Sequence, residues 1–159
     1  MITYDLSTRI VVQVAEDEDL GALFARVTRR LIDAERPLLE VHGLSMWAYV
    51  ALSHLARNPA GTQLVLAQAM RYDKTRLIGL LDALEDGGLI TRTVDPTDRR
   101  ARIVALTEAG AARYAAVRAD IRAMEDELLE DLSPVERTRL RETLAGLGSA
   151  ADTGLRERS

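Results

Sequence analysis

The stretch from residue 89 to residue 110, LITRTVDPTDRRARIVALTEAG, constrains the fold more than any other part of the chain. Residues 89–94 follow the period-two pattern of a β-strand. Residues 95–98, Asp-Pro-Thr-Asp, are typical of a turn, because proline presets φ and aspartate accepts hydrogen bonds from the nearby backbone. Three arginines, Arg99, Arg100 and Arg102, follow and lead into the apolar residues Ile103, Val104 and Leu106, which predicts a returning strand. The stretch is therefore expected to form a β-hairpin with arginines clustered at its tip.

A helix is expected directly after this hairpin, with Thr107 as its N-cap and Glu108 in its first turn. A hairpin that carries arginines at its tip has a well-known use in DNA binding. It lies along the duplex and places an arginine in the negative potential of a narrow minor groove.

Two short helices are predicted immediately before the hairpin, in residues 62–88. Thr62 is expected to cap the first helix and Asp73 the second. The second helix has an apolar face with the spacing i, i+3, i+4 and i+7, formed by Leu77, Leu80, Leu81 and Leu84. Gly87 and Gly88 are expected to end it. Two short helices followed by a hairpin make a helix-turn-helix with a wing.

This region closely resembles the MarR family of winged-helix transcription regulators, and the resemblance extends over residues 20–147. The motifs that carry it are Leu66-Ala67, Leu84-Glu85-Asp86-Gly87-Gly88-Leu89-Ile90, Asp95-Pro96-Thr97-Asp98-Arg99-Arg100 and Leu106-Thr107-Glu108-Ala109-Gly110. The resemblance implies a homodimer that binds double-stranded DNA.

The rest of the chain is expected to be helical, apart from residues 1–15, whose structure the sequence leaves open. One helix starts at Asp19, is broken or kinked at Pro37 and continues to residue 43, and a second follows Ser45. The longest helix is expected over about 108–132. Ser133 and Glu136 form a capping box for the last helix, and residues 148–159 are expected to fray.

We therefore expect a mainly α fold with a small β-hairpin. Residues 45–107 form a winged helix-turn-helix lobe, and residues 1–44 and 108–159, from both chain termini, form a helical dimerisation lobe. The longest helix carries a narrow apolar seam that is nearly a heptad repeat. Such a seam is explained either by packing of the terminal helices within one chain or, as the resemblance implies, by a second subunit.

The amino-acid composition argues against several classes of protein and kinds of site. The net charge of −4 argues against a uniformly basic nucleic-acid coat protein. Acidic residues are concentrated in residues 16–19 and 120–131, however, whereas residues 92–102 hold four arginines and two aspartates. The chain has no cysteine, so it has no disulfide, thiol redox sensor or thiolate metal site. No apolar run is long enough to span a membrane and no signal peptide is recognisable, so a cytoplasmic location is expected.

The candidate DNA contacts come from the two parts of the winged helix-turn-helix. The N-terminal turns of a recognition helix normally reach the base edges. The candidates there and in the preceding turn are Arg71, Tyr72, Lys74, Thr75 and Arg76. By resemblance, Arg100 enters the minor groove and Asp98 orients the wing arginines, while Arg99 and Arg102 support them at phosphates. For any one of these lysine or arginine side chains, the alternative to a DNA contact is an ordinary solvated charge on the surface.

A small aromatic or anionic effector is also implied, since MarR-like regulators often bind such ligands between the dimer helices and the winged lobe. The candidate residues are His42, Trp47, His54 and Tyr114. The alternative is that Trp47 belongs to the core and His54 is an ordinary half-buried histidine.

An enzyme is not expected, because the chain lacks a cysteine nucleophile, a phosphate-binding glycine loop and a paired metal-ligand motif. No catalytic residue, metal or cofactor is predicted. The favoured function is a dimeric repressor that reads a pseudo-palindromic operator. The alternative is a ligand-binding or protein-interaction module of the same fold without sequence-specific DNA binding.

Overall fold

The computed structural model describes residues 18–59 and 61–154, with side chains up to residue 148. The segment 1–15, the acidic residues Glu16 and Asp17 and the final residues 155–159 lie outside the described residues. The chain forms two compact units, Met1–Ile121 and Arg122–Ser159.

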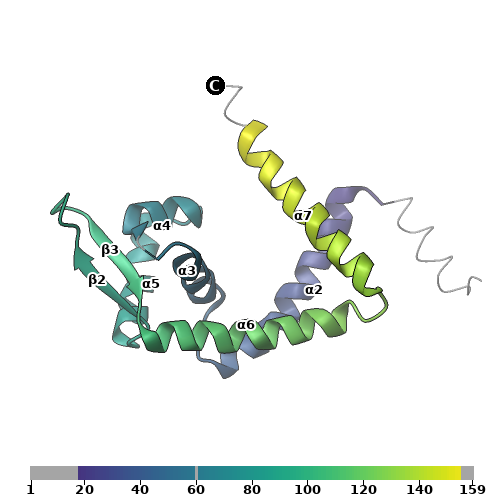
Figure 1. Cartoon of the computed structure of the whole chain (residues 1–159), viewed down its shortest axis with the longest axis horizontal. Helices are drawn as coiled ribbons and strands as arrows, with labels where there is room; N and C mark the ends of the chain where they lie inside the picture. Colours follow the sequence, from purple (N-terminus) through teal and green to yellow (C-terminus); the bar gives the residue numbers. More distant parts are fainter. Residues whose placement is uncertain (1–17, 60, 155–159) are drawn as a thin grey trace, which may run out of the picture. The chain divides into compact units, whose positions relative to one another are not determined.

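The first unit contains most of the elements (Figure 1). These are α2 (Leu20–Val41), α3 (Met46–Arg57), β1 (Gly61–Thr62), α4 (Gln63–Ala69), α5 (Lys74–Asp86), β2 (Ile90–Val94), β3 (Arg102–Leu106) and the larger part of α6 (Glu108–Leu128). The order confirms the expected mainly α fold, with two short helices ahead of a hairpin and a long helix behind it.

Each predicted N-cap in this unit accepts a backbone hydrogen bond from the residue three positions later. The Asp19 carboxylate accepts from Ala22 at 2.9 Å, and the Ser45 hydroxyl accepts from Ala48 at 3.1 Å. Likewise, the Thr62 hydroxyl accepts from the Val65 amide at 3.3 Å, and the Asp73 carboxylate accepts from the Arg76 amide at 2.9 Å. These bonds satisfy amide groups that have no partner within the helix, which explains why the helices begin where they do.

The predicted hairpin is part of a three-stranded antiparallel sheet with the order β1-β3-β2. In the hairpin, Ile90 pairs with Leu106 and Val94 with Arg102. The third strand, β1, was not predicted, because two residues are too few to show a period-two pattern. It adds Gly61 opposite Val104.

A close backbone contact joins the base of the hairpin to α6. The Thr107 hydroxyl donates to the Gly88 carbonyl at 2.7 Å and accepts from the Gly110 amide at 2.9 Å, which confirms Thr107 as the cap of α6. A Cβ atom on Gly110 would lie 1.9 Å from the Leu89 carbonyl oxygen. The glycine of the Leu-Thr-x-x-Gly motif is therefore required by this contact.

The core of the first unit joins the helix-turn-helix to the sheet and to α6. Its largest fully buried side chains are Leu52, Leu81, Ile90, Val104 and Val117. Each buried aliphatic side chain contributes about 1.5–3 kcal/mol relative to an exposed one. The core therefore fixes α5 and the hairpin on one common support.

Three predicted helix limits differ from the structure. Helix α2 runs through Pro37 without a break and ends at Val41, two residues before the predicted end at residue 43; Pro37 is exposed, so water can reach the carbonyl group that loses its amide partner. The long helix ends at Leu128 rather than near 132, because the amides of Glu130 and Leu132 turn to carbonyls three residues earlier. The last helix, in turn, extends beyond residue 148 to Gly154.

The second unit contains the end of α6 and α7 (Pro134–Gly154). The predicted capping box is present: the Glu136 carboxylate accepts from the Ser133 amide at 2.8 Å and from its hydroxyl at 2.6 Å. Two ion pairs link the two helices of this unit, Arg137 with Asp126 at 3.7 Å and Arg141 with Glu125 at 2.9 Å.

Candidate nucleic-acid interface

The N-terminal turn of α5 presents a group of exposed polar side chains. Lys74, Thr75 and Arg76 are all exposed, and Asp73 holds the start of the helix through its cap. The preceding Arg71 has a φ of 48°, in the left-handed region that a non-glycine residue rarely adopts, and it makes the sharp turn between α4 and α5. The partial positive charge of a helix N-terminus adds to the charge of Lys74 and Arg76.

Tyr72 differs from these neighbours because its ring is half-buried against another element. It packs on Trp47 of α3 with ring centroids 4.5 Å apart and an angle of 40° between the ring planes. Trp47 remains 43% exposed. The aromatic pair therefore links the start of α3 to the turn that precedes the recognition helix.

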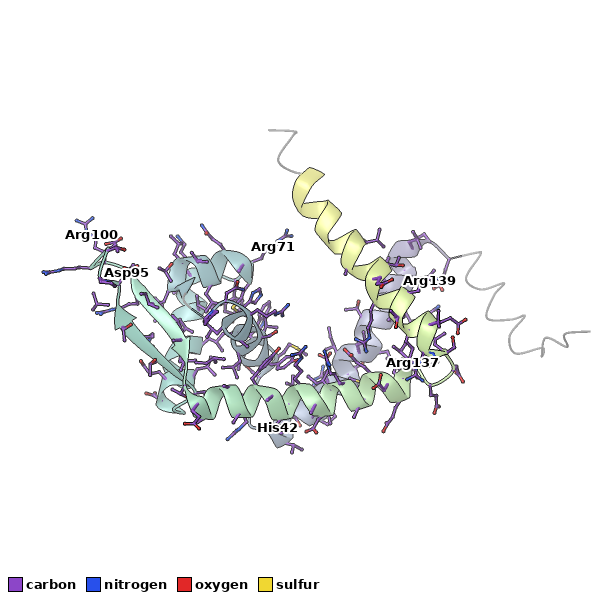
Figure 2. All side chains as sticks on the ribbon, in the orientation of Figure 1. His42, Arg71, Asp95, Arg100, Arg137 and Arg139 are labelled. Carbon is purple, nitrogen blue, oxygen red and sulfur yellow. The ribbon has the colours of Figure 1, made fainter. Side chains whose placement is uncertain are left out.

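The tip of the hairpin is built by its two aspartates. Asp95 accepts from the Thr97 amide at 2.8 Å and from the Thr97 hydroxyl at 2.6 Å, and these bonds lower the pKa of the Asp95 carboxyl. Asp98 accepts from the Arg100 backbone amide at 3.0 Å. The link between Asp98 and the wing arginines is thus a backbone hydrogen bond that shapes the turn. Figure 2 shows Asp95 and Arg100 together at this tip.

The wing, defined as residues 90–106, carries three exposed arginines, Arg99, Arg100 and Arg102. The fourth arginine of this region, Arg92, is not part of the exposed cluster. Its side chain is 19% exposed and binds two carboxylates of α5, Glu85 at 2.8 Å through Nε and Asp82 at 2.7 Å. The expectation that Arg92 adds to the positive field of the wing is therefore wrong, because two acidic partners neutralise it.

A groove of about 340 Å³ lies between the start of α4, α5 and the wing. Its charged rim comprises Lys74, Asp98, Arg100 and Arg102, and its apolar lining includes Leu64, Leu77, Ile78 and Leu81. The structure thus brings one predicted helix contact and three predicted wing residues to the same groove. The other predicted contacts, Arg71, Tyr72, Thr75, Arg76 and Arg99, do not line it.

Helical spacing alone did not single out Ile78, which lies on α5 and is 53% exposed. It lies three residues after Thr75 and four before Asp82, both of which are exposed. An apolar residue flanked by polar ones on that face is the signal that could have identified it.

The four candidate ligand residues do not meet at a single place among the described contacts. His42 Nε2 lies 2.6 Å from Asp120 Oδ2, and Arg113 donates to the His42 carbonyl. Tyr114 lies next to Ser53, with 3.5 Å between their hydroxyl oxygens. Trp47 packs on Tyr72, as described above.

His54 lines a separate small cavity of about 50 Å³ together with Leu55, Val65 and Leu66. Burial, and then the Arg57 guanidinium, lowers the pKa of His54 below 6.5. The lowered pKa favours the neutral imidazole. These contacts agree with the alternative of an ordinary half-buried histidine at this position.

Within the described ranges, no group of three or more His, Cys, Asp or Glu side chains is arranged to hold a metal ion. Among the same residues, no helix combines the length and apolar character needed to cross a membrane.

Comparison with known proteins places the winged lobe in a family. A model of the MarR family matches residues 42–101. A transcriptional regulatory protein for the hcr operon of Thauera aromatica is 30% identical over 105 residues, which are 66% of this chain and 63% of that protein. The chain thus matches less than two thirds of the length of this relative.

Solved structures match over more of their length. A MarR-family transcriptional regulator from Rhodococcus sp. RHA1 is 27% identical, with a TM-score of 0.72, and the match covers 91% of this chain and 96% of that one. The transcriptional repressor CouR, solved on a 23-mer DNA duplex, is 30% identical, with a TM-score of 0.73 and coverage of 83% and 94%. These relatives are transcription regulators rather than enzymes, which agrees with the expectation from the sequence. The chain belongs to the MarR family.

Proposed function

We propose that the protein is a homodimeric transcription repressor that binds a pseudo-palindromic DNA operator. In each subunit, α5 enters the major groove and the wing places Arg100 in the adjacent minor groove. The observation that carries this proposal is the shared groove, in which Lys74 of α5 and Arg100 and Arg102 of the wing line one surface. A double helix presents its major and minor grooves side by side, so such a surface can contact both.

The roles of the α5 residues follow from their exposure and chemistry. Arg76 is suited to a bidentate contact with a guanine edge, and Thr75 to a phosphate or a thymine methyl group. Arg71 is assigned to a phosphate. Tyr72 is assigned a contact at the edge of the interface, because its ring packs against Trp47.

The local field supports this assignment although the whole chain carries a net charge of −4. Two acids on the later turns of α5, Asp82 and Glu85, bind Arg92, whereas the start of α5 and the wing tip carry more exposed cations than aspartates. Exposed cations therefore dominate the surface formed by the start of α5 and the wing, and local field rather than net charge governs docking.

We further propose that a small aromatic or anionic molecule regulates DNA binding. CouR, a structural relative at 26% identity and a TM-score of 0.69, has been solved with p-coumaroyl-CoA bound. In this chain the candidate contacts remain His42, Trp47, His54 and Tyr114. Because they are dispersed within the subunit, any common site has to be completed by a conformational change or by the second subunit. The proposal places the protein in the cytoplasm, together with the DNA.

The test is a band-shift selection from a pool of random-sequence duplexes. The expected result is enrichment of a palindromic motif with half-sites about one helical turn, roughly 10 bp, apart. Failure to enrich any motif would exclude sequence-specific binding. The protein would then be a ligand-binding or protein-interaction module of the same fold.

A further inference from the structure

Ile78 is an apolar side chain on the face of α5 that carries the polar candidates. The buried face of this helix is complete without it, since Leu77, Leu81 and Leu84 are each at most 4% exposed. Ile78, by contrast, is 53% exposed and forms part of the groove shared with the wing. Core packing therefore does not account for an isoleucine at this position.

The surroundings of Ile78 define the chemistry of a partner. Lys74 lies one helical turn before it, and Lys74, Arg100 and Arg102 line the same groove. A groove lined by apolar side chains, by these three cations and by one acid, Asp98, fits a polyanion that displays an apolar group. In the major groove of DNA, the 5-methyl group of thymine is the apolar group on the base edges.

The residue after Ile78 allows close approach to this face. A Cβ atom on Gly79 would meet no atom within 4 Å, so packing within the subunit does not require glycine there. Glycine in a helix interior nevertheless costs about 1 kcal/mol relative to alanine. The open space beside Ile78 leaves room for the edge of a base pair.

The acid on the same face is held away from free solution by an ion pair. Asp82 lies one turn after Ile78, where a free carboxylate would repel the phosphates. Arg92 lies 2.7 Å away and offsets part of this charge, which it shares with Glu85.

We propose that Ile78 determines part of the operator sequence by packing against the 5-methyl group of one thymine in each half-site. This inference rests on the proposed function, because it assigns a base to one residue of the DNA-binding surface.

The experiment uses the duplex that the wild-type protein selects from the random pool. Each thymine is replaced in turn by deoxyuridine, which removes only the methyl group. We expect one thymine position per half-site at which replacement lowers the affinity about fourfold, the factor that corresponds to one buried methyl group. For Ile78→Ala, the affinity for the unmodified duplex should fall by at least that factor, and deoxyuridine at the same position should cause no further loss.

Two variants serve as controls. Ile78→Val keeps a branched apolar side chain and should retain sensitivity to the thymine methyl. Val65→Ala removes a side chain of similar exposure, 55%, from α4. In this variant, replacing the thymine by deoxyuridine should lower the affinity as much as it does for the wild type. Melting temperatures of all variants, measured by circular dichroism, verify that each remains folded.

The outcomes separate this inference from the proposed function. If the wild-type protein enriches no duplex, both are overturned. Suppose instead that the wild-type protein enriches a duplex but its affinity is unchanged when any thymine is replaced by deoxyuridine. Only the role of Ile78 is then overturned. The same holds if the replacement lowers the affinity of Ile78→Ala as much as that of the wild type.

Discussion

Substitutions of Arg100 in the wing and Arg76 in α5 test the two parts of the proposed interface one residue at a time. Both side chains are exposed, and surface substitutions usually change stability by no more than about 0.5 kcal/mol. Arg100→Ala should weaken binding on matched and mismatched duplexes alike and reduce the salt slope by about one charge, because a wing arginine in the minor groove contributes mainly charge. The measurement is affinity over a salt series. Unchanged affinity and slope would show that the hairpin does not contact DNA.

Arg76→Ala should behave differently. If its guanidinium binds a guanine edge, the substitution should cost roughly 1–3 kcal/mol on the selected site and relax specificity at one base position. Binding to each single-base variant of the operator measures this relaxation. A uniform loss over all variants would instead assign Arg76 to a phosphate.

Gly79→Ala should change stability and DNA binding in opposite directions. A Cβ atom meets nothing within 4 Å, so alanine fits the subunit and should stabilise α5 by up to about 1 kcal/mol. The same methyl group would occupy the space proposed for DNA, so affinity should fall. Urea unfolding and a band shift on the same preparation measure both effects. A more stable variant with full affinity would show that DNA does not approach this position closely.

Residues with a local role could be predicted from the sequence, whereas those with a distant partner could not. Asp73 and Thr107 were predicted as caps because a cap acts on the backbone three residues ahead. Arg92 was misinterpreted because its carboxylate partners lie on α5, and alternation along a strand does not reveal a neighbouring helix. Ile78 was missed because a helical wheel identifies the buried face more readily than an apolar exception on the other one.

At the scale of elements, Arg92 joins the recognition helix to the first strand of the wing. Besides its ion pairs, its backbone amide donates to Glu85 at 3.1 Å, so the contact constrains both the strand and its side chain. This contact orients α5 relative to β2. It therefore affects the spacing between the proposed major-groove and minor-groove contacts.

Arg92→Gln should lower stability at neutral pH and weaken DNA binding. The hydrogen bond from Arg92 is the largest cause of the lowered pKa of Glu85, whose ordinary value is 4.5. A carboxyl whose pKa falls on folding stabilises the protein above its unfolded-state pKa, and this contribution is lost as the pH falls through the folded-state value. Urea midpoints of the wild type and the variant should therefore differ at pH 7 and converge at a pH well below 4.5.

Arg99→Gln is the matched control, since it removes an exposed arginine for which no ion pair with the described carboxylates was found. Its midpoint should follow the wild type over the whole pH range. A difference between the wild type and Arg92→Gln that persists unchanged into the acid range would show that Arg92 acts through packing rather than through its charge.

The order of the helices and strands was predictable because most of them have a strong local signal in the sequence. Where some of them begin and end depends instead on contacts with neighbouring elements. The hairpin, both short helices and the five caps of the winged lobe and α2 follow from periodicity and turn residues. Strand β1 exists because β3 offers a free edge to Gly61 and Thr62. The grouping of the four candidate ligand residues stays a prediction, because the contacts of each within the subunit involve other residues.

For the whole molecule, the proposed dimer rests on two apolar stripes that remain exposed in the subunit. On α2, Leu20, Phe24 and Val27 are between 45% and 71% exposed, and on α7, Leu140, Leu144 and Leu147 are between 36% and 57% exposed. Both stripes have the spacing i, i+4 and i+7, which places their members on one side of a helix. Exposed stripes of this kind are typical of surfaces that a partner covers.

We expect light scattering to report a homodimer at micromolar concentration. Phe24→Glu and Leu144→Glu, tested separately, should each shift the mass toward the monomer, because a charge on a buried apolar contact is costly. DNA affinity should fall steeply in the same variants, since a monomer engages one half-site and loses the effective concentration that links two. Val135→Glu, at a position that is 68% exposed and on the side of α7 opposite to Leu144, is the control. A monomeric wild type that still binds the selected duplex would contradict the dimer and leave α5 and the wing as a self-sufficient DNA-binding unit.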